Sequence, residues 1–269
     1  MNILLVQNPA KPQAKELAKA VEQFLHKKNI TVIAPEQYTN AISVDLIVSL
    51  GGDGSILKIM HEFPSLDAPI MGINLGSLGF LADIGISEIF ESLEQFLQGV
   101  YRIQDRLMLE GAVGHTPASF AVNEIVVHRG KNHTLIDLAV HVDGKYLNTF
   151  SADGLIVATP SGSTAYSLSS GGPILTPELD CVVITPICPH AISNRPIVLK
   201  IHKSIEIECL GAHQSVEVSF DGIPRFCLEK EQKCTIATSS RHFKLVTLKS
   251  HDYFETLRTK LGWTGTLKS

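Results

Sequence analysis

One carboxylate stands inside a glycine-rich turn, in a position where it could take part in phosphate chemistry. Asp53 lies within Gly51-Gly52-Asp53-Gly54, which follows the apolar run Asp45–Leu50 and precedes the helix-compatible stretch Ser55–Phe63. A strand, a glycine turn and a helix in this order present backbone N–H groups at one sheet edge, which suits phosphate. Asp53 would repel phosphate unless a metal ion or a hydroxyl lies between them. We therefore predict that Asp53 faces a hydroxyl that receives a phosphoryl group.

Other readings of this turn are open. Aspartate and glycine are ordinary turn formers, so the stretch could be only a tight loop after a strand. It is not a Walker loop, because no Gly-Lys-Ser/Thr ends it, and it lacks the Gly-x-Gly-x-x-Gly spacing of dinucleotide-binding turns.

Two further stretches could bind a ligand. A second glycine-rich turn, Gly72–Leu81, would let backbone approach a ligand closely, or it could be an irregular loop that needs positive φ. The polar pair Asn123-Glu124 interrupts the apolar strand-like run Ser119–His128. An amide and a carboxylate side by side can bind vicinal hydroxyls or an amino group. The alternative is a strand edge or a bulge.

The segment Asp153–Gly172 is the richest in short hydroxyl side chains. A strand, Leu155–Thr159, leads into a long predicted loop of Ser, Thr and Gly that contains Tyr166. Hydroxyls and bare backbone can bind a sugar or a base, and a tyrosine ring can stack on a base. Long loops in compact domains tend to be functional. A serine hydrolase is disfavoured, since no Gly-x-Ser-x-Gly elbow is present.

Composition and charge disfavour several classes of protein. A net charge of −4 over 269 residues argues against a general nucleic-acid or anionic-membrane partner. The five cysteines show neither zinc spacing nor a disulfide framework, and the eleven histidines are scattered. The N-terminus resembles a first strand rather than a signal peptide, and no apolar run could span a bilayer. We expect a cytoplasmic protein that binds no membrane.

Periodicity predicts an α/β first part. Apolar runs predict strands, and apolar residues at helical spacing predict helices between them. The predicted strands are residues 3–6, 31–34, 45–50 and 69–74, and the predicted helices are residues 14–28, 55–63 and 86–97. This alternation is typical of an open, mainly parallel sheet with right-handed crossovers.

The character of the chain changes near Gly99-Val100-Tyr101. From there to about Ala237, short strand-like runs dominate, and Asp143-Gly144 and Asp221-Gly222 indicate tight hairpins. We predict an α/β domain over residues 1–100, a β-rich domain of stacked sheets over residues 101–237, and a C-terminal segment over residues 238–269. That segment turns helical over Tyr253–Leu261 and would pack back on the first domain.

Taken together, these motifs resemble the NAD kinase family. They occur in the family's order over most of the chain, and as an ordered set they are highly specific. The matching stretches are Gly51–Gly54, Gly72–Gly76, Leu78–Leu81, Asn123-Glu124, Asp153-Gly154, Thr164–Ser169, Gly171–Pro173, Ile184–His190 and Asn194–Pro196.

The resemblance implies a fold and a reaction. The fold would be an N-terminal α/β domain with a mainly parallel sheet, a β-rich C-terminal domain, and a site between the two. The reaction would be transfer of the ATP γ-phosphoryl group to the adenosine-ribose 2′-hydroxyl of NAD. A divalent cation, Mg²⁺ or Mn²⁺, would accompany the ATP, with no protein ligand assigned to it. Homo-oligomers are usual in the family.

The resemblance also implies residue roles. Asp53 would accept the proton of the 2′-hydroxyl, as an aspartate does in protein kinases. Tyr166 would lie against a base, and Lys58 falls where relatives often carry a basic residue. The NAD site would be lined by Gly54, Asn123, Glu124, Asp153, Thr164, Ala165, Tyr166, Ser167, Leu168 and Ser169.

At four positions this chain departs from the family pattern. Ser151 and Thr134 stand where some members have a basic residue. Cys188 replaces a commoner alanine, and Ile223 lies where many members have glutamine. These departures affect the outer contacts of the predicted NAD site, to which Ser151 and Cys188 belong, and not the reaction.

Two alternative functions follow from the same motifs. A diacylglycerol-type lipid kinase shares the Gly-Gly-Asp-Gly turn but needs an apolar acyl channel, and the hydroxyl-rich loop favours a nucleotide instead. A non-catalytic NAD-binding regulator would keep the scaffold without turnover. Formation of NADP from NAD and ATP distinguishes the three functions.

Overall fold

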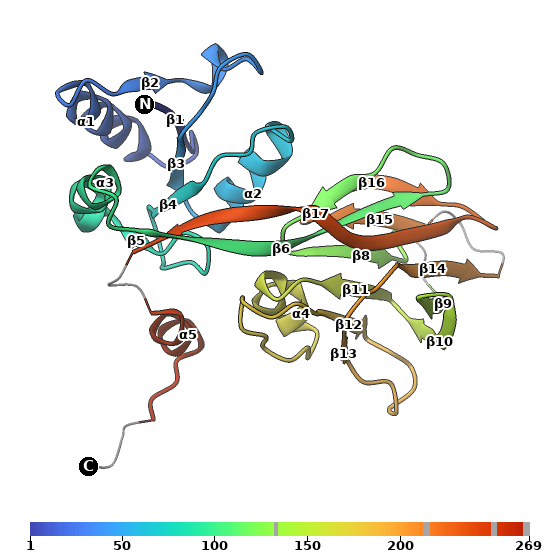
Figure 1. The fold of residues 1–269 in the computed structure, drawn as a ribbon. Coiled ribbons are helices and arrows are strands. Elements are labelled where there is room, and N and C mark those ends of the chain that lie inside the picture. Colours follow the sequence, from blue (N-terminus) through green and yellow to red (C-terminus); the bar gives the residue numbers. More distant parts are fainter. Residues whose placement is uncertain (132–133, 212–215, 249–251, 266–269) are drawn as a thin grey trace. The chain divides into compact units, whose positions relative to one another are not determined.

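The computed structural model describes residues 1–131, 134–211, 216–248 and 252–265 (Figure 1). By compactness the chain divides into two units, residues 1–105 with 244–269, and residues 106–243. Strand β6 (Arg102–Val113) carries the chain from the first unit to the second, and strand β17 (Lys233–Thr247) returns it. The predicted domains over residues 1–100 and 101–237, with a C-terminal segment over residues 238–269, stay a prediction.

The first unit contains a parallel sheet, as the alternation of strands and helices predicts. Strands β2, β1, β3 and β4 lie side by side in that order. Strand β5 and the end of β17 also pair with β4 in parallel. The elements are β1 (Asn2–Gln7), α1 (Ala14–His26), β2 (Thr31–Ile33), η1 (Pro35–Gln37), β3 (Leu46–Gly51), α2 (Asp53–Glu62), β4 (Ile70–Asn74), β5 (Ile84–Gly85), η2 (Ile86–Glu88), α3 (Ile89–Leu97) and α5 (Tyr253–Leu261).

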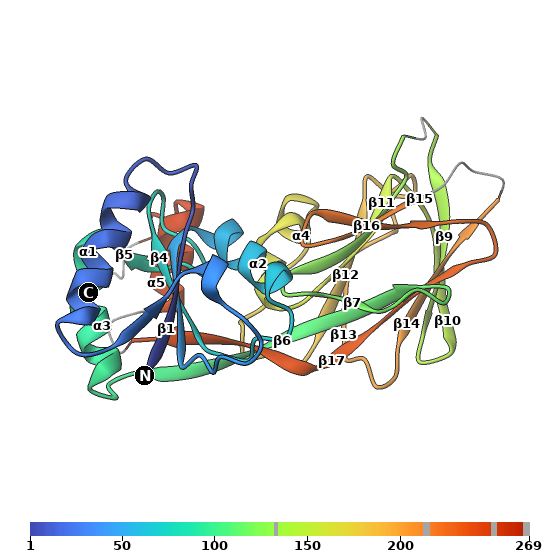
Figure 2. The same cartoon turned by 90° about the horizontal axis from the view of Figure 1, so that it is seen from above.

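Helices cover both faces of this parallel sheet. Val21 and Leu25 of α1 share one buried cluster with Leu93 of α3 and with Val48 of the sheet. Figures 1 and 2 show α1 and α3 on one face and α2 on the other. Cover on both faces explains why every residue of β3 and β4 is buried.

Helix α2 begins at Asp53, two residues before the predicted start at Ser55. Gly52 is its N-cap, and its carbonyl accepts from the N–H groups of Ser55 and Ile56. An acidic residue in the first turn suits the positive end of the helix dipole. The aspartate of the glycine turn is therefore the first residue of the helix and not part of the loop.

The second unit is built from antiparallel sheets. One has the order β13-β12-β11-β8-β15-β16, and another joins β10, β9, β14 and the first part of β17, with β6 and β7 beside it. The further strands and helices are β7 (Ser119–Ala121), β8 (Glu124–His128), β9 (Ile136–Val142), β10 (Lys145–Ala152), β11 (Gly154–Ala158), η3 (Ser161–Thr164), α4 (Tyr166–Ser169), β12 (Val182–Ile187), β13 (Ile197–Leu199), β14 (Ile205–Leu210), β15 (Val216–Phe220) and β16 (Ile223–Leu228).

The two sheets of the second unit pack on each other. Ile125 and Phe220 of the first sheet and Val140 and Ile207 of the second belong to one buried cluster. Strand β14 alternates buried and half-buried residues along most of its length, as expected for a sheet with one face in the core. The predicted β-rich part of stacked sheets is confirmed.

Two local predictions in this unit are wrong. The run 119–128 is two strands, β7 and β8, because the chain breaks at Val122 and Asn123. The predicted long loop 161–170 contains the short helices η3 and α4. There the Ser163 hydroxyl donates to the Pro160 carbonyl at 2.6 Å, so hydroxyls that suggested a loop stabilise a helical turn.

In the ranges that the structure describes, no helix is long and apolar enough to span a bilayer.

Candidate functional site

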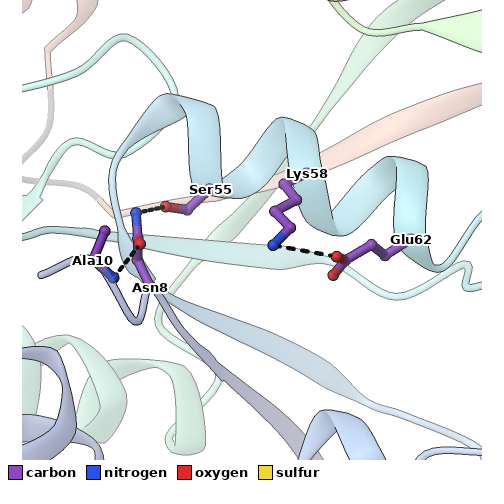
Figure 3. Close-up of polar contacts among 5 residues, drawn as sticks. All are labelled: Asn8, Ala10, Ser55, Lys58 and Glu62. Atoms are coloured by element: carbon purple, nitrogen blue, oxygen red, sulfur yellow. Dashed lines mark hydrogen bonds and ion pairs between the residues drawn. The ribbon is translucent and has the colours of Figure 1, made fainter. Parts of the chain in front are cut away.

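The glycine turn brings strand β3 and helix α2 very close together. A side chain at Gly51 would collide with the hydroxyl of Ser55, so glycine is required there for steric reasons. The same hydroxyl accepts a hydrogen bond of 3.0 Å from Asn8, at the end of β1 (Figure 3). The Asn8 side chain also accepts from the backbone N–H of Ala10 and so joins the β1 turn to the start of α2.

Asp53 is held by the backbone of the second glycine turn. Its Oδ2 accepts from the N–H of Phe80 at 2.9 Å, and its Oδ1 accepts from Leu81 at 3.0 Å and Ala82 at 2.8 Å. A side chain at Gly79 would collide with the same carboxylate. A carboxylate offers about four lone-pair positions, so these bonds occupy both positions of Oδ1 and one of Oδ2. The remaining acceptor position of Oδ2 can receive a hydroxyl proton.

Asn74 shapes the second glycine turn from the end of β4. Its side-chain amide donates to the Ala82 carbonyl at 3.1 Å, and its oxygen accepts from the Gly76 N–H at 2.7 Å. The side chain is buried, with 6% of its surface exposed. A buried amide with its donor and acceptor both satisfied fixes the loop that in turn fixes Asp53.

A cavity of about 900 Å³ opens within the first unit, at the carboxyl ends of its parallel strands. Ligands bind at this edge in open α/β sheets. The glycine turn and Asp53 line one part of the cavity, together with Lys11, Lys58 and Lys260. Strand β2, helix η1 and the residue between them line another part, through Val32, Ala34, Pro35, Glu36 and Gln37. Lys58 is largely exposed and pairs with Glu62 at 3.4 Å on the same face of α2 (Figure 3).

The predicted pair Asn123-Glu124 lies at the start of β8 in the second unit, and both side chains are buried. The carboxylate of Asp221 accepts from the N–H groups of Val122, Asn123 and Glu124, at 2.9, 2.7 and 3.2 Å. Thr159, at the end of β11, donates its hydroxyl to the Val122 carbonyl at 2.7 Å. The backbone of the pair is therefore held from both sides.

Glu124 is an unusual buried acid. Burial raises its pKa to about 8; the negative charge of Asp221 adds to the rise, and a hydrogen bond from the Tyr166 backbone opposes it. Among the described residues, its Oε2 has no hydrogen-bond partner. A buried oxygen without a partner is costly, so a ligand group that binds there removes an existing penalty.

The Ser/Thr-rich segment uses many of its hydroxyls internally. Ser167 is fully buried and shares a hydrogen bond of 2.9 Å with Thr185, and the Thr164 hydroxyl donates to the Ser161 carbonyl. Ala165 and Leu168 are half-buried, whereas Ser169 and Tyr166 are exposed. Of the predicted contacts in this segment, Tyr166 and Ser169 are the most accessible to a ligand.

Ser151, Asp153 and Cys188 lie close together in the second unit. The Asp153 N–H donates to the Ile187 carbonyl, and the His190 N–H donates to the Ser151 carbonyl, both at 2.9 Å. The Asp153 carboxylate pairs with Arg129 at 2.7 Å, and the Ser151 hydroxyl donates to Asp137. Cys188 is exposed and has a positive φ of 45°. Burial raises the pKa of the Tyr166 hydroxyl, and the charges of Cys188 and Asp153 add to this rise. Tyr166 thus interacts with this group and, through its backbone, with Glu124.

The predicted residues therefore form two groups, one in each unit. Asp53, Gly54 and Lys58 border the cavity of the first unit, and the others lie in the second. Sequence patterns did not predict Asn8, Lys11, Thr159 or the carboxylate of Asp221 as parts of these surroundings. Only Asp221 carried a signal, its Asp-Gly turn, because the partners of the others depend on the fold. Thr134 lies just beside residues 132–133, and nothing in the described contacts gives it a ligand role.

Comparisons with known proteins match both halves of the chain. The family model described as ATP-NAD kinase N-terminal domain matches residues 39–101, and the ATP-NAD kinase C-terminal domain matches residues 122–248. The NAD kinase of Protochlamydia amoebophila is 52% identical and covers 99% of each chain. The NAD kinase of Syntrophotalea carbinolica is 42% identical, with 91% of this chain and 89% of that one covered.

Solved structures agree with these matches. A yeast NADH kinase complexed with NADH aligns with a TM-score of 0.90 at 28% identity, covering 100% of this chain and 89% of that one. An NAD kinase from Archaeoglobus fulgidus in complex with ATP aligns with a TM-score of 0.80, also at 28% identity, covering 96% and 99%. The ordered motifs, the fold and the relatives lead to one conclusion: this chain belongs to the NAD kinase family of phosphotransferases.

Proposed function

We propose that the protein transfers the γ-phosphoryl group of ATP to the 2′-hydroxyl of the adenosine ribose of NAD. A bond forms between the ribose 2′-oxygen and the γ-phosphorus, and the bond from that phosphorus to the β,γ-bridging oxygen breaks. The hydroxyl proton passes to Asp53 and then to solvent. The products are NADP and ADP.

The geometry of Asp53 is the observation that carries this proposal. Three backbone N–H groups orient its carboxylate and leave one acceptor position of Oδ2 for the 2′-hydroxyl. A carboxylate is a weak base toward a sugar hydroxyl, so Asp53 orients the hydroxyl first and accepts its proton late. Because the transition state of phosphoryl transfer is loose, positioning of the hydroxyl accounts for much of the catalysis.

ATP binds, in this proposal, in the cavity of the first unit. Its phosphates lie near the N-terminus of α2, where the backbone of Gly52 and Gly54 and the amines of Lys11 and Lys58 offset negative charge. A volume of about 900 Å³ is large enough for a nucleoside triphosphate. The adenosine lies toward β2 and η1, where the lining is more apolar.

NAD binds through the second unit. Glu124 and Asn123 bind the sugar hydroxyls or the amino group of the base, since both are buried and Glu124 Oε2 is unpartnered among the described residues. Tyr166, with 41% of its surface exposed, stacks on a base. Asp153, Ser151, Cys188 and Ser169 form the outer contacts. Ala165 and Leu168 pack beside the Tyr166 ring. The hydroxyls of Thr164 and Ser167 act mainly by shaping the helical turns of residues 161–169.

The divalent cation enters as part of the ATP substrate. Where the structure describes the chain, no three His, Cys, Asp or Glu side chains lie close enough together to hold a metal ion. In addition, most acceptor positions of Asp53 are occupied by backbone N–H groups. The proposal assigns no protein ligand to the cation, and Mg²⁺ or Mn²⁺ would neutralise phosphate charge as the nucleotide complex.

Incubation with NAD, ATP and Mg²⁺ tests the proposal, with NADP as the measured product. Parallel reactions replace NAD by NADH or by diacylglycerol, and ATP by inorganic polyphosphate. NADP formation that requires ATP supports the proposal. Binding of NAD without turnover would support a regulator instead, and phosphorylation of the lipid would support a lipid kinase.

Two properties of the setting belong to the same proposal. We expect the protein to act in the cytoplasm, which the unpaired state of all five cysteines supports. We also expect a homo-oligomer, since β-rich units have edge strands that can pair. Light scattering at several concentrations measures the mass of the particle.

A further inference from the structure

We propose that Asp221 is a positioning residue for the Asn123-Glu124 pair and so determines how tightly the protein holds NAD. The inference rests on the proposed function. Asp221 itself contacts no ligand in this account, and it acts through the backbone of residues 122–124.

The backbone of this short segment is held at almost every polar group. Asp221 accepts from the N–H groups of Val122, Asn123 and Glu124, and the Asp221 N–H donates to the Glu124 carbonyl at 3.0 Å. Thr159 donates its hydroxyl to the Val122 carbonyl and its N–H to the Asn123 carbonyl at 2.8 Å. Val122 and Asn123 belong to no strand, and Glu124 is the first residue of β8. These hydrogen bonds therefore fix a segment that strand pairing alone does not hold.

The Asp-Gly turn is what points the Asp221 carboxylate at this segment. Asp221 and Gly222 both have positive φ, 50° and 75°, and form the two-residue connection between Phe220 and Ile223. Such turns match the twist of a hairpin, and Asp and Gly tolerate the left-handed conformation. The carboxylate then lies against the neighbouring strand β8 instead of pointing to solvent.

The same turn occurs once more in the second unit, away from the predicted site. Asp143 and Gly144 have φ of 51° and 80° and connect β9 to β10. The Asp143 carboxylate accepts from the N–H groups of His202, Lys203 and Ser204, and the Asp143 N–H donates to the Ser204 carbonyl. The two turns have the same backbone conformation and the same kind of hydrogen bonds. They differ in the segment that the aspartate binds, which is residues 122–124 for Asp221 and residues 202–204 for Asp143.

The test compares Asp221→Asn with the matched control Asp143→Asn. Asparagine tolerates the left-handed conformation, so both variants keep the turn and lose one carboxylate charge. For D221N we expect the Kd and KM for NAD to rise about 10-fold or more, because hydrogen bonds to a charged acceptor are stronger than those to a neutral one. The KM for ATP should stay within about twofold. D143N should leave the Kd for NAD within about twofold.

Two readouts separate positioning from a general loss of stability. Hydrogen exchange of the backbone N–H groups of residues 122–124 should speed up in D221N, while D143N should speed up exchange at residues 202–204 only. The pH dependence of NAD binding should also shift in D221N. The negative charge of Asp221 raises the pKa of Glu124. Removal of that charge should therefore move the midpoint of the pH dependence of NAD binding to lower pH.

Each outcome decides the inference. Equal effects of D221N and D143N on the Kd for NAD, or no effect of D221N, would overturn it. If D221N does not fold, Asp221→Ser, whose hydroxyl can still accept one hydrogen bond, undergoes the same measurements. Wild-type protein is assayed alongside: absence of NADP formation by wild type contradicts the proposed function, whereas an active wild type with an unaffected D221N contradicts only the role of Asp221.

Discussion

The carboxylate of Asp53 accepts a hydrogen bond of 2.8 Å from the backbone N–H of Ala82, 29 residues further along the chain. This bond joins the start of α2 to the second glycine turn, so the two glycine-rich motifs of the sequence act as one structural feature. The turn orients the acid, and Asn74 orients the turn. The predicted reaction depends on this chain of contacts.

Asp53→Asn should reduce turnover by a factor of about 10² to 10⁴, the usual contribution of a positioned acid or base. The amide nitrogen of asparagine can occupy the place of either carboxylate oxygen. In both places it faces a backbone N–H that needs an acceptor, and an amide nitrogen cannot accept that hydrogen bond. NAD binding should persist. NADP formation measures the first effect and calorimetry with NAD measures the second. Asp143→Asn is the control, and wild-type turnover by D53N would remove Asp53 from the mechanism.

Gly79→Ala should reduce turnover without removing the fold. A methyl group at residue 79 would collide with the Asp53 carboxylate, so either the acid or the turn must move. Because a misplacement of about 1 Å can cost about 100-fold in rate, we expect a loss of that order. Gly76→Ala, in the same turn, brings its methyl group no closer than 3.5 Å to the Lys11 amine and should cost much less. Equal losses in both variants would contradict the role given to Gly79. Kinetics and circular dichroism measure the two effects.

Glu124→Gln should change how stability depends on pH. The folded-state pKa of Glu124 is about 8, above the ordinary value of 4.5, so the folded protein binds this proton more tightly than the unfolded chain does. The stability that it contributes is complete below pH 4.5 and is lost as the pH rises to about 8. Glutamine does not ionise, so the free energy of unfolding of the variant should rise relative to that of wild type between these two pH values. The pKa rises by about 3.5 units, so at about 1.4 kcal/mol for each unit the gain in stability is on the order of 5 kcal/mol.

Thermal unfolding of wild type and E124Q between pH 4 and pH 9 measures this difference. The two midpoints should diverge in favour of E124Q as the pH rises. Asp180→Asn, which alters an exposed acid paired with Lys200, is the control and should show no such divergence. Parallel curves for wild type and E124Q would mean that Glu124 ionises at an ordinary pH.

Lys58→Ala should raise the KM for ATP about 3- to 10-fold with little change in stability. Lys58 lines the cavity beside Asp53, and its pair with Glu62 is a surface pair worth less than about 1 kcal/mol. Lys19→Ala, on the exposed part of α1, is the control for loss of a positive charge. Initial rates at varied ATP give both values. If K19A raises the KM as much as K58A does, the effect reflects net charge and not contact with phosphate.

Much of the fold follows from local patterns in the chain. Apolar runs such as Leu46–Gly51 and the helical spacing of Val21 and Leu25 predict the parallel sheet and the helix beside it, since these patterns depend only on neighbouring residues. Asp221-Gly222 predicts a hairpin for the same reason. Strand β17 extends past Ala237 to Thr247, because its second half gains its partner, β4, only in the fold.

The sequence by itself determined the family motifs, the order of strands and helices, and the identity of Asp53 and Glu124 as the acids to examine. Tertiary structure decided what surrounds those acids. Backbone N–H groups from residues 80–82 reach Asp53, and the charge of Asp221 lies near Glu124. Hydrogen bonds and burial depend on which distant segments come together in the fold, and local patterns of residue type and spacing do not reveal those long-range contacts.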